Sequence, residues 1–472
     1  MIPDRFAPVL DELRPLTERF GAADKRLYLV GGTVRDLLIN TLGDDRDYDA
    51  TTDARPAEIK ACLEGWADAI WTQGERFGTI GAKKGERIYE ITTHRAEAYN
   101  EDSRKPDVTF ADVIDADLSR RDFTVNAMAL ELTSDSPSLV DPFGGAADLA
   151  TRTLRTPLSP ETSFGDDPLR MLRAIRFAAQ LQFTITDRTW QGIKQNVQRI
   201  KIITQERITD ELNKILMSPK PSVGFDLLYK SGLLHIIFPM MVDLEGAEYI
   251  DGKGHKDNFY HTLQVIDNIC AKTDDLWLRW AALLHDIGKP ATKKFEEGHG
   301  WTFHGHEVIG GRMVHKIFTK LKLPQNEKMR FVRKMVELHL RPIGLTKENI
   351  TDSAIRRLLF DAGEDIDALM TLCEADITSK NKTKVKRYLE NFELVRQRME
   401  AVEEKDRIRN WQPPITGEMI MEIFNLTPCR AVGDIKNAIR DAILDGDIQN
   451  NYEAAYELML KKALELNLQP VK

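Results

Sequence analysis

The stretch "RLYLVGGTVRDLLI", residues 26–39, is typical of a β-strand, a tight turn at Gly31 and Gly32, and a helix that begins near Thr33. Glycine lets backbone amides approach an anion closely, and a helix N-terminus carries a partial positive charge. Arg35, in the first helical turn, adds a side chain that can donate two hydrogen bonds to one phosphate. Many Gly-Gly turns are purely structural. This one is predicted to bind the phosphates of a nucleotide because it is followed by acidic residues that can hold the accompanying metal ions.

The acidic cluster lies in "LGDDRDYDATT", residues 42–52. If this segment is a strand, Asp47 and Asp49 point to the same face, with Cα atoms roughly 6.6 to 7 Å apart. Two such carboxylates can bind a pair of Mg²⁺ ions about 3.5 to 4 Å apart, an arrangement that serves nucleotidyl transfer. Glu90 lies on another predicted strand, and we expect it to face the same metals. The other two aspartates are expected to be solvated and to cap the preceding turn: Asp44 and Asp45.

The composition of the 472-residue chain indicates a globular protein of about three domains. No apolar run approaches the roughly 20 residues that a membrane span needs, and the first residues resemble no secretion signal, so we expect a cytoplasmic protein without a membrane partner. The net charge of −8 argues against general coating of nucleic acid but allows a local basic groove. The four cysteines are isolated and are expected to be buried thiols: Cys62, Cys270, Cys373 and Cys429.

The secondary-structure pattern changes near residue 155. Before it, short β-rich runs alternate with helical ones, which predicts a sheet packed with helices. After it, apolar residues recur three and four apart, as in 167–183 and 354–372, so the rest should be almost wholly α-helical. Stretches rich in Pro, Ser and Asn indicate loops or domain boundaries at 134–138, 157–162, 218–222 and 410–414.

A second motif, "SRRDFTVNAMAL", covers residues 119–130. We expect Asp122 to cap a helix, Arg120 and Arg121 to precede its positive end, and Asn126 to lie one turn in. Such a group can hold a phosphate and a ribose hydroxyl. The alternative is a capped helix with a surface ion pair.

A third motif, "DDPLRMLRAIRF", covers residues 166–177, and its arginines recur every three residues: Arg170, Arg173 and Arg176. A carboxylate accepts from an exocyclic amine, and a guanidinium donates to the neighbouring ring nitrogen. Cytosine and adenine both offer that edge, whereas uracil and guanine do not. Asp167 with Arg170 can therefore select C and A without a template. The alternative is an amphipathic helix with a basic face.

In order and spacing, these three motifs resemble those of the class II tRNA nucleotidyltransferases, the CCA-adding enzymes, and of the related bacterial poly(A) polymerases. The resemblance covers nearly the whole chain, continues to "GEMIMEIFNLTPCRAVGDI" at residues 417–435, and suits the actinobacterial-type branch. The family assigns base selection to the Asp and Arg that match Asp167 and Arg170. It usually has Glu where this chain has Asp166.

The resemblance implies an α+β fold, in which a small polymerase β-like mixed-sheet head is followed by helical parts. The implied domains are a nucleotidyltransferase head (1–155), a nucleotide-selecting neck (156–220), a body with an HD domain (221–390) and a tail (391–472). It implies template-independent addition of CCA to the tRNA 3′ end from CTP and ATP, with two Mg²⁺ ions and release of pyrophosphate.

A histidine-rich constellation around "HDIGK", residues 285–289, resembles the HD phosphohydrolase superfamily. Neutral imidazoles with carboxylates suit Mg, Mn, Fe, Ni or Zn. The minimal predicted ligand set is His261, His285, Asp286 and Asp376, with His306 and His339 as further candidates. Whether this site hydrolyses phosphoesters stays open, because HD domains also serve as scaffolds.

Two basic runs, residues 379–388 and 328–342, are candidates for contacts with tRNA phosphates, and we expect recognition of shape rather than sequence. No protein partner is expected. The alternatives are a poly(A) polymerase, a partial enzyme that adds only CC or only A, a nucleotide-signalling enzyme, and a non-catalytic RNA-binding relative. Residues 96–110 match a flexible loop that the family needs for the change from C to A, and their full length predicts the complete CCA product.

Overall fold

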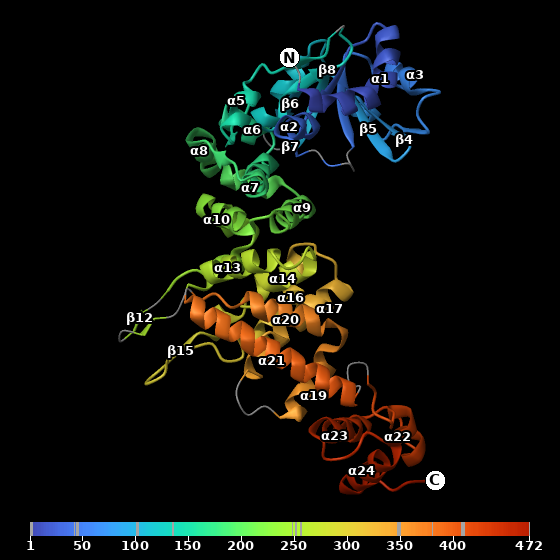
Figure 1. Ribbon diagram of the computed structural model, residues 1–472, viewed down its shortest axis with the longest axis vertical. Helices are drawn as coiled ribbons and strands as arrows, with labels where there is room; N and C mark the ends of the chain where they lie inside the picture. Colours follow the sequence, from blue (N-terminus) through green and yellow to red (C-terminus); the bar gives the residue numbers. More distant parts are fainter. Residues whose placement is uncertain are drawn as a thin grey trace. The chain divides into compact units, whose positions relative to one another are not determined.

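The computed structural model (Figure 1) describes residues 3–41, 43, 47–100, 103–134, 136–247, 249–250, 253–254, 257–346, 351–379, 381–406 and 411–471. Asp44 and Asp45 lie outside the described residues. The chain forms two compact units, Met1–Val242 and Asp243–Lys472. The four-part division expected from sequence remains a prediction, and helix α21 (Lys382–Asp406) crosses the expected boundary at 390/391 without a break.

A seven-stranded mixed sheet forms the centre of the head, in the order β3-β4-β5-β2-β1-β8-β9. Strands β2 and β5 are parallel, and the other neighbouring pairs are antiparallel. The strands are β1 (Leu27–Val30), β2 (Tyr48–Thr52), β3 (Ala69–Trp71), β4 (Thr79–Lys84), β5 (Arg87–Thr93), β8 (Ala129–Glu131) and β9 (Ser138–Val140).

The central strand β1 is buried along its whole length, as its apolar sequence "LYLV" requires. Tyr28 and Val30 pack with Leu118, Ala127 and Ala129 in one core cluster. The strand ends at a glycine with a φ of 74°, and α2 (Gly32–Ile39) begins at the next residue. The strand, turn and helix predicted from the opening stretch are therefore confirmed.

The remaining elements of the head are the 16-residue helix α1 and several shorter segments. They are η1 (Asp4–Phe6), α1 (Ala7–Ala22), α3 (Pro56–Leu63), η2 (Glu75–Phe77), β6 (Arg95–Asn100), β7 (Ser103–Phe110), α4 (Ile114–Ser119), η3 (Thr124–Asn126), α5 (Gly145–Ala150) and β10 (Thr153–Leu154). The expected flexible loop at 96–110 is instead a β6–β7 hairpin, in which antiparallel pairing satisfies the backbone polar groups. The prediction of an α-helix after Asp122 is wrong, because only the single 3₁₀ turn η3 fits before β8 begins.

After the head, the first unit is helical, as predicted. Its elements are α6 (Pro160–Asp166), α7 (Leu169–Leu181), β11 (Thr184–Ile185), α8 (Asp187–Asn196), η4 (Val197–Ile202), α9 (Gln205–Leu216), α10 (Pro221–Ser231), α11 (Leu233–Ile237) and α12 (Pro239–Val242). Helix α7 packs against both α9 and α10. On α10, a Cβ at Gly224 would come within 2.4 Å of the Ile215 side chain, so glycine permits the close approach of α9.

The second unit is almost entirely helical, which confirms the predicted class. It contains β12 (Tyr249–Ile250), β13 (Lys253–Gly254), α13 (Asn258–Cys270), α14 (Leu276–Leu284), α15 (Lys289–Thr292), β14 (Lys294–Glu296), β15 (Gly300–Thr302), α16 (His306–Lys320), α17 (Glu327–Leu338), α18 (Arg341–Gly344), α19 (Asp352–Ala362), η5 (Gly363–Asp365), α20 (Ile366–Ala375), α21, α22 (Gly417–Phe424), α23 (Arg430–Asp445) and α24 (Tyr452–Glu465). The last three helices share a core of their own (Figure 1).

Among the residues that the structure describes, no helix combines the length and apolar character needed to cross a membrane. All four cysteines are free thiols. Cys62 and Cys373 are buried as expected, Cys270 is half-buried, and Cys429 is exposed because it stands in the polar turn before α23.

An ion pair between a buried carboxylate and a partly exposed arginine fixes α7 to the head. The Asp122 carboxylate accepts hydrogen bonds from Nε of Arg173 on α7 at 2.7 Å and from the Asn126 amide at 3.0 Å. Burial alone would raise the pKa of Asp122, but the Arg173 charge and these hydrogen bonds outweigh it and lower the pKa to about 2. The carboxylate is therefore ionised at neutral pH and holds the base of α7 in place.

This ion pair predicts a pH-dependent contribution to stability. The unfolded state binds the Asp122 proton near pH 4 and the folded state only near pH 2, so the stabilisation is present above about pH 4 and disappears as the pH falls toward 2. Asp122→Asn should lower the free energy of unfolding of the first unit by about 2 kcal/mol at pH 7. Urea titrations from pH 7 to 2.5 should show the difference from the parent shrinking with acidity. Asp112→Asn, at an exposed carboxylate, is the control. A difference that is constant with pH contradicts this account.

Candidate functional site

A cavity of about 540 Å³ in the first unit collects most of the predicted site residues. Residues of α2, β2, the segment after α4, α7 and α9 line it. The lining residues are Gly31, Gly32, Arg35, Asp49, Arg121, Asp122, Asn126, Asp167, Leu169, Arg170, Arg173, Arg176, Phe177, Gln180 and Arg207. Three motifs that lie far apart in the sequence therefore meet in one cavity.

The turn at Gly31 and Gly32 lies at the edge of this cavity. A Cβ at Gly31 would be 3.3 Å from Nη1 of Arg121 and 3.9 Å from Oδ2 of Asp49, so a guanidinium and a carboxylate both approach the turn. Arg35 is held in place by its neighbours: Nη1 donates to Oδ1 of Asn126 at 2.7 Å, and Nε and Nη2 donate to the adjacent Asp36 at 2.7 and 3.0 Å. The turn and its arginines have the chemistry of an anion site.

Asp49 on β2 and Glu90 on β5 are direct neighbours, because the parallel strands pair in register at these two residues. Burial raises the pKa of the Asp49 carboxyl, Asp47 raises it further, and Arg121 offsets these effects only in part. Burial, Asp49 and Asp47 all raise the pKa of Glu90. Asp47 and Asp49 therefore lie close enough to the Glu90 carboxyl to disfavour its charged form, and a bound cation relieves such repulsion.

The three carboxylates do not face the cavity equally. Only Asp49 lines it. Asp47 precedes β2, and its Oδ1 accepts a hydrogen bond from the Ile88 amide at 3.2 Å. Among the described residues, groups of three ligands within 4.8 Å of one another occur only in the second unit. Asp47 and Asp49 are exposed and alternate with the buried Tyr48 and Ala50, so they point to the same face, and Glu90 pairs with Asp49. The oxygen donors suit Mg²⁺ chemically, and their joint binding of Mg²⁺ stays a prediction.

The residues of the second motif fall into two groups. Arg121, Asp122 and Asn126 line the cavity. The Arg120 guanidinium does not: it binds the buried Asp117, at 2.8 Å from Nη2 to Oδ1. Because no α-helix follows Asp122, its carboxylate accepts from the Phe123 amide, the Asn126 side chain and Arg173 instead of capping one.

The base-selecting helix predicted by the third motif begins where expected. Oδ1 of Asp167 accepts from the Leu169 amide at 3.1 Å at the start of α7. Arg170 is buried, and its Nη1 donates to Oγ of Ser163 at 3.1 Å while its Nη2 donates to the Arg120 carbonyl. Asp167 and Arg170 both line the cavity, so the structure places the predicted base-reading pair beside the phosphate turn.

The other two arginines of α7 are tied to carboxylates. Arg173 binds Asp122, and Nε of Arg176 lies 3.0 Å from Oε2 of Glu211 on α9, an ion pair without hydrogen-bond geometry. The ring of Phe177 lies beside three guanidinium groups, at 5.3, 5.7 and 4.4 Å from the Cζ atoms of Arg35, Arg173 and Arg176. An aromatic face stabilises nearby cations, so this ring helps to hold the arginines together.

Four lining residues were missed by the sequence analysis: Leu169, Phe177, Gln180 and Arg207. The first three lie on α7, and Phe177 shares the helical face of Arg170 and Arg173, a spacing that was available in the sequence. Arg207 is exposed and lies on α9. No motif pointed to it, because only the packing of α7 on α9 brings it to the cavity.

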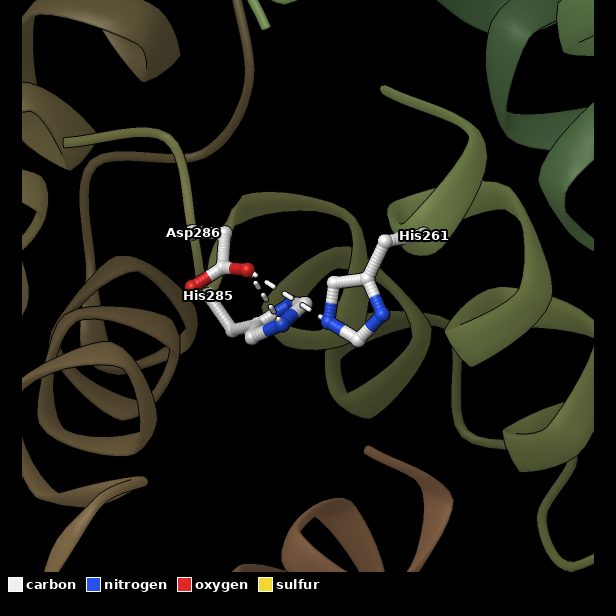
Figure 2. Close-up of side chains that lie close together, drawn as sticks. All are labelled: His261, His285 and Asp286. Carbon is white, nitrogen blue, oxygen red and sulfur yellow. Dashed lines mark ion pairs between the residues drawn. The ribbon is translucent and has the colours of Figure 1, made fainter. Parts of the chain in front are cut away.

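A second site, in the other unit, gathers all the predicted HD ligands. Figure 2 shows the Asp286 carboxylate paired with both His261 and His285: its Oδ2 lies 3.5 Å from Nε2 of His261 and 3.2 Å from Nε2 of His285. Asp376 lies 2.9 Å from Nε2 of His261. On the other side of Asp286, Nε2 of His306 and of His339 lie 3.3 and 3.9 Å from Oδ1. Six predicted ligands therefore converge from α13, α16 and the C-terminal ends of α14, α17 and α20.

The imidazoles are held in one orientation. Nδ1 of His285, His306 and His339 each lies 2.7 to 2.8 Å from the backbone carbonyl three residues earlier in the chain. Nδ1 of His261 lies 2.9 Å from Oγ1 of Thr378. A carbonyl fixes the proton on Nδ1, and the Nε2 lone pair then points into the cluster, which is how histidine is prepared as a metal ligand. Nε2 of His285 is buried and has no hydrogen-bond partner among the described atoms.

The electrostatics of this cluster favour a cation. Burial opposes charge on His285, but Asp286 and Asp376 outweigh it and raise its pKa to about 10. Burial and the His285 charge lower the pKa of His339 to about 4. Asp376 and His261 open onto a cavity of about 610 Å³, whose other lining residues are Asn258, Lys289, Phe303, Ile343, Thr346, Cys373, Ile377, Thr378, Ser379, Lys384, Tyr388 and Phe392. The donor set fits a divalent metal next to an accessible cavity.

Comparison with known families accounts for most of the chain. Residues 27–155 match the family model described as "Poly A polymerase head domain". Residues 182–244 match "Probable RNA and SrmB- binding site of polymerase A", and residues 258–380 match "HD domain". The first match covers the mixed sheet and the Gly-Gly turn, and the last covers the histidine cluster.

Relatives and a solved structure agree with these matches. The chain is 31% identical to an A-adding tRNA nucleotidyltransferase of Deinococcus radiodurans over 90% of this chain and 93% of that protein. It is 40% identical to a CCA-adding enzyme of Lactobacillus helveticus over 49% of this chain and 56% of that enzyme, so this match spans little more than half of it. The CCA-adding enzyme of Bacillus stearothermophilus, solved in complex with CTP, shares the fold with a TM-score of 0.68 and 23% identity over 98% and 99% of the two chains. The chain belongs to the tRNA nucleotidyltransferase family and carries the head and HD domain of its class II members.

Proposed function

We propose that this protein adds the 3′-terminal CCA to tRNA from CTP and ATP without a template. The observation that carries the proposal is the single cavity in which the phosphate turn, Asp49 and the Asp167–Arg170 pair meet. Its volume of about 540 Å³ is in the range of small-molecule sites. The names of the Deinococcus and Lactobacillus relatives support tRNA as the acceptor.

In the proposed reaction, the 3′ hydroxyl of tRNA attacks the α-phosphorus of the bound nucleotide. A new P–O bond forms, the bond to the bridging oxygen of the β-phosphate breaks, and pyrophosphate leaves. The turn at Gly31 and Gly32, with Arg35 and Arg121, would hold the triphosphate, and Asn126 would contact the ribose. Asp167 and Arg170 would accept from the exocyclic amine and donate to the ring nitrogen of C or A.

Asp47 and Asp49 are the proposed ligands of two Mg²⁺ ions, with Glu90 beside them. Bound Mg²⁺ would activate the attacking hydroxyl and stabilise the departing pyrophosphate. Support comes from the register of Asp49 with Glu90 and from the raised pKa of both carboxyls, to which burial and neighbouring carboxylates contribute. Asp36 and Asn126 hold Arg35 at the turn independently of any ion.

Addition of A alone is the second candidate function. It is favoured by the A-adding name of the Deinococcus relative, whose alignment covers 90% of this chain. The full-length segment at 96–110 favours the complete CCA product instead, since the family needs this segment for the change from C to A. A poly(A) polymerase or a non-catalytic RNA-binding relative fits these observations less well.

We also propose that the HD cluster binds a divalent transition metal. The convergence of four Nε2 atoms and two carboxylates supports this, as does the carbonyl that orients each of three imidazoles. The tRNA phosphates are proposed to contact exposed basic residues of α17 and α21, which carry the two basic runs. A cytoplasmic location and the actinobacterial-type branch remain part of the proposal; the free cysteines support the first and the motif likeness the second.

Removal of the carboxylates tests the transfer site. Asp49→Asn or Asp47→Ala should lower the rate of nucleotide addition to tRNA lacking its 3′ end at least about a hundredfold, because a major electrostatic element is lost, while tRNA binding persists. Products resolved to one nucleotide provide the measurement. Asp11→Asn, an exposed carboxylate on α1, is the control. Near-parental rates in both variants would contradict the proposed role of Asp47 and Asp49.

Base selection and product length form a separate prediction. With CTP and ATP together, the parent should complete CCA; a product that stops at CC, or a protein that extends only tRNA already ending in CC, contradicts full addition. Asp167→Asn should lower discrimination against UTP and GTP by roughly tenfold or more, because one carboxylate oxygen becomes an NH2 donor that can pair with the carbonyl of uracil or guanine. The control is Asp187→Asn at the exposed start of α8. Unchanged rejection of UTP would refute the base-edge role.

The HD proposal predicts loss of metal without loss of transfer. After chelation and reconstitution, Asp286→Asn or His285→Ala should hold much less transition metal than the parent, while nucleotide addition largely persists. Gly288→Ala should have a similar effect, because its Cβ would meet the His306 carbonyl at 2.2 Å and displace that ligand. Gly344→Ala, with no atom within 4 Å of its Cβ, is the matched control. Parental metal content in all three variants refutes the site.

A further inference from the structure

Asp117, in α4, is a fully buried carboxylate that binds two consecutive arginines. Its side chain has 0% exposure. Nε and Nη2 of Arg120 lie 3.1 and 2.8 Å from Oδ1, and Nη2 of Arg121 lies 3.1 Å from Oδ2. Each carboxylate oxygen is therefore used by a different guanidinium. An uncompensated buried charge is strongly unfavourable, so the three groups depend on one another.

The two arginines lead to different sides of the nucleotide cavity. Arg121 lines it, and its Nη1 would be 3.3 Å from a Cβ at Gly31, beside the phosphate turn. Arg120 acts through its backbone: its carbonyl accepts a hydrogen bond from Nη2 of Arg170, the predicted base-reading arginine. One buried carboxylate thus connects the phosphate side of the cavity with the base side.

The charge of Asp117 holds two adjacent cations in place. Burial raises its pKa, but Arg121 and Arg120 outweigh this effect and the pKa is lowered, so the group is ionised at neutral pH. The arginine side chains are each only 19% exposed. Nε of Arg121 is buried and has no hydrogen-bond partner among the described atoms. Without the carboxylate, two neighbouring guanidinium groups would repel and turn toward water.

We propose that Asp117 is a positioning residue for nucleotide binding, which holds the Arg121 guanidinium at the phosphate turn and the Arg120 carbonyl under Arg170. This inference rests on the proposed function of the cavity. Asp117 does not line the cavity and touches no substrate. It acts through residues that do, so its loss weakens nucleotide binding more than turnover.

The test compares Asp117→Asn, which keeps the shape and removes the charge, with Asp112→Asn, an exposed carboxylate between β7 and α4. Calorimetry would measure the Kd for CTP without tRNA, and steady-state addition would measure KM and kcat for CTP and ATP. In Asp117→Asn, both Kd and KM should rise about tenfold or more, since a charge-assisted contact is misplaced, while kcat and the affinity for tRNA stay within about threefold. Asp112→Asn should match the parent.

A double-mutant cycle with Arg121→Lys distinguishes positioning from general stability. If Asp117 acts through Arg121, the two substitutions together should weaken CTP binding far less than the product of their separate effects. Multiplicative effects, an unchanged Kd, or an Asp117→Asn protein that unfolds or loses tRNA affinity as well would overturn the inference. A parent that binds CTP but adds nothing to tRNA would refute the proposed function and leave this binding test in force. A parent that does not bind CTP would refute both.

Discussion

The geometry of the cavity in the first unit depends on one ion pair, between the buried Asp122 of the head and the partly exposed Arg173 of α7. Its carboxylate also receives the Asn126 amide, and Asn126 in turn receives Arg35 from the phosphate turn. The chain of contacts therefore runs from α7 to the turn at Gly31 and Gly32. A buried charge must be paired to be tolerated, so any displacement of α7 from the head leaves a costly unpaired group. This constraint gives the cavity a defined geometry before a nucleotide arrives.

The cavity and its edge carry one group of carboxylates and one group of arginines. Asp49 on β2 raises the pKa of Glu90 on β5, and both carboxyls suit a cation, whereas arginines from α2, the segment after α4, and α7 surround Phe177 and the turn and suit an anion. A nucleoside triphosphate with divalent cations satisfies both sets, because its phosphates neutralise the arginines and its metals neutralise the carboxylates. Either set alone is unfavourable in a partly buried site. A charged ligand that neutralises both sets should therefore stabilise the cavity.

The HD cluster differs from the cavity of the first unit in how its side chains are held. Four of its six predicted ligands are buried, the six converge from five helices, and backbone carbonyls fix three of the four imidazoles. Geometry of this kind does not depend on long flexible side chains, so the donor atoms are held in place before any ion binds. The two candidate metal-binding sites lie in separate compact units of the chain.

The sequence by itself determined the mixed-sheet head, the helical remainder and nearly every polar residue of both sites, because these features follow from local periodicity and from motifs of fixed spacing. It placed the strand, turn and helix at Gly31 correctly. Only the tertiary structure decided that Arg120 faces Asp117 and that Asp47 lies off the cavity. It alone brought Arg207 to the cavity rim and left too little chain for a helix after Asp122. The physical reason is that side-chain partners across the fold, and the length left between strands, are set by packing over long sequence separations.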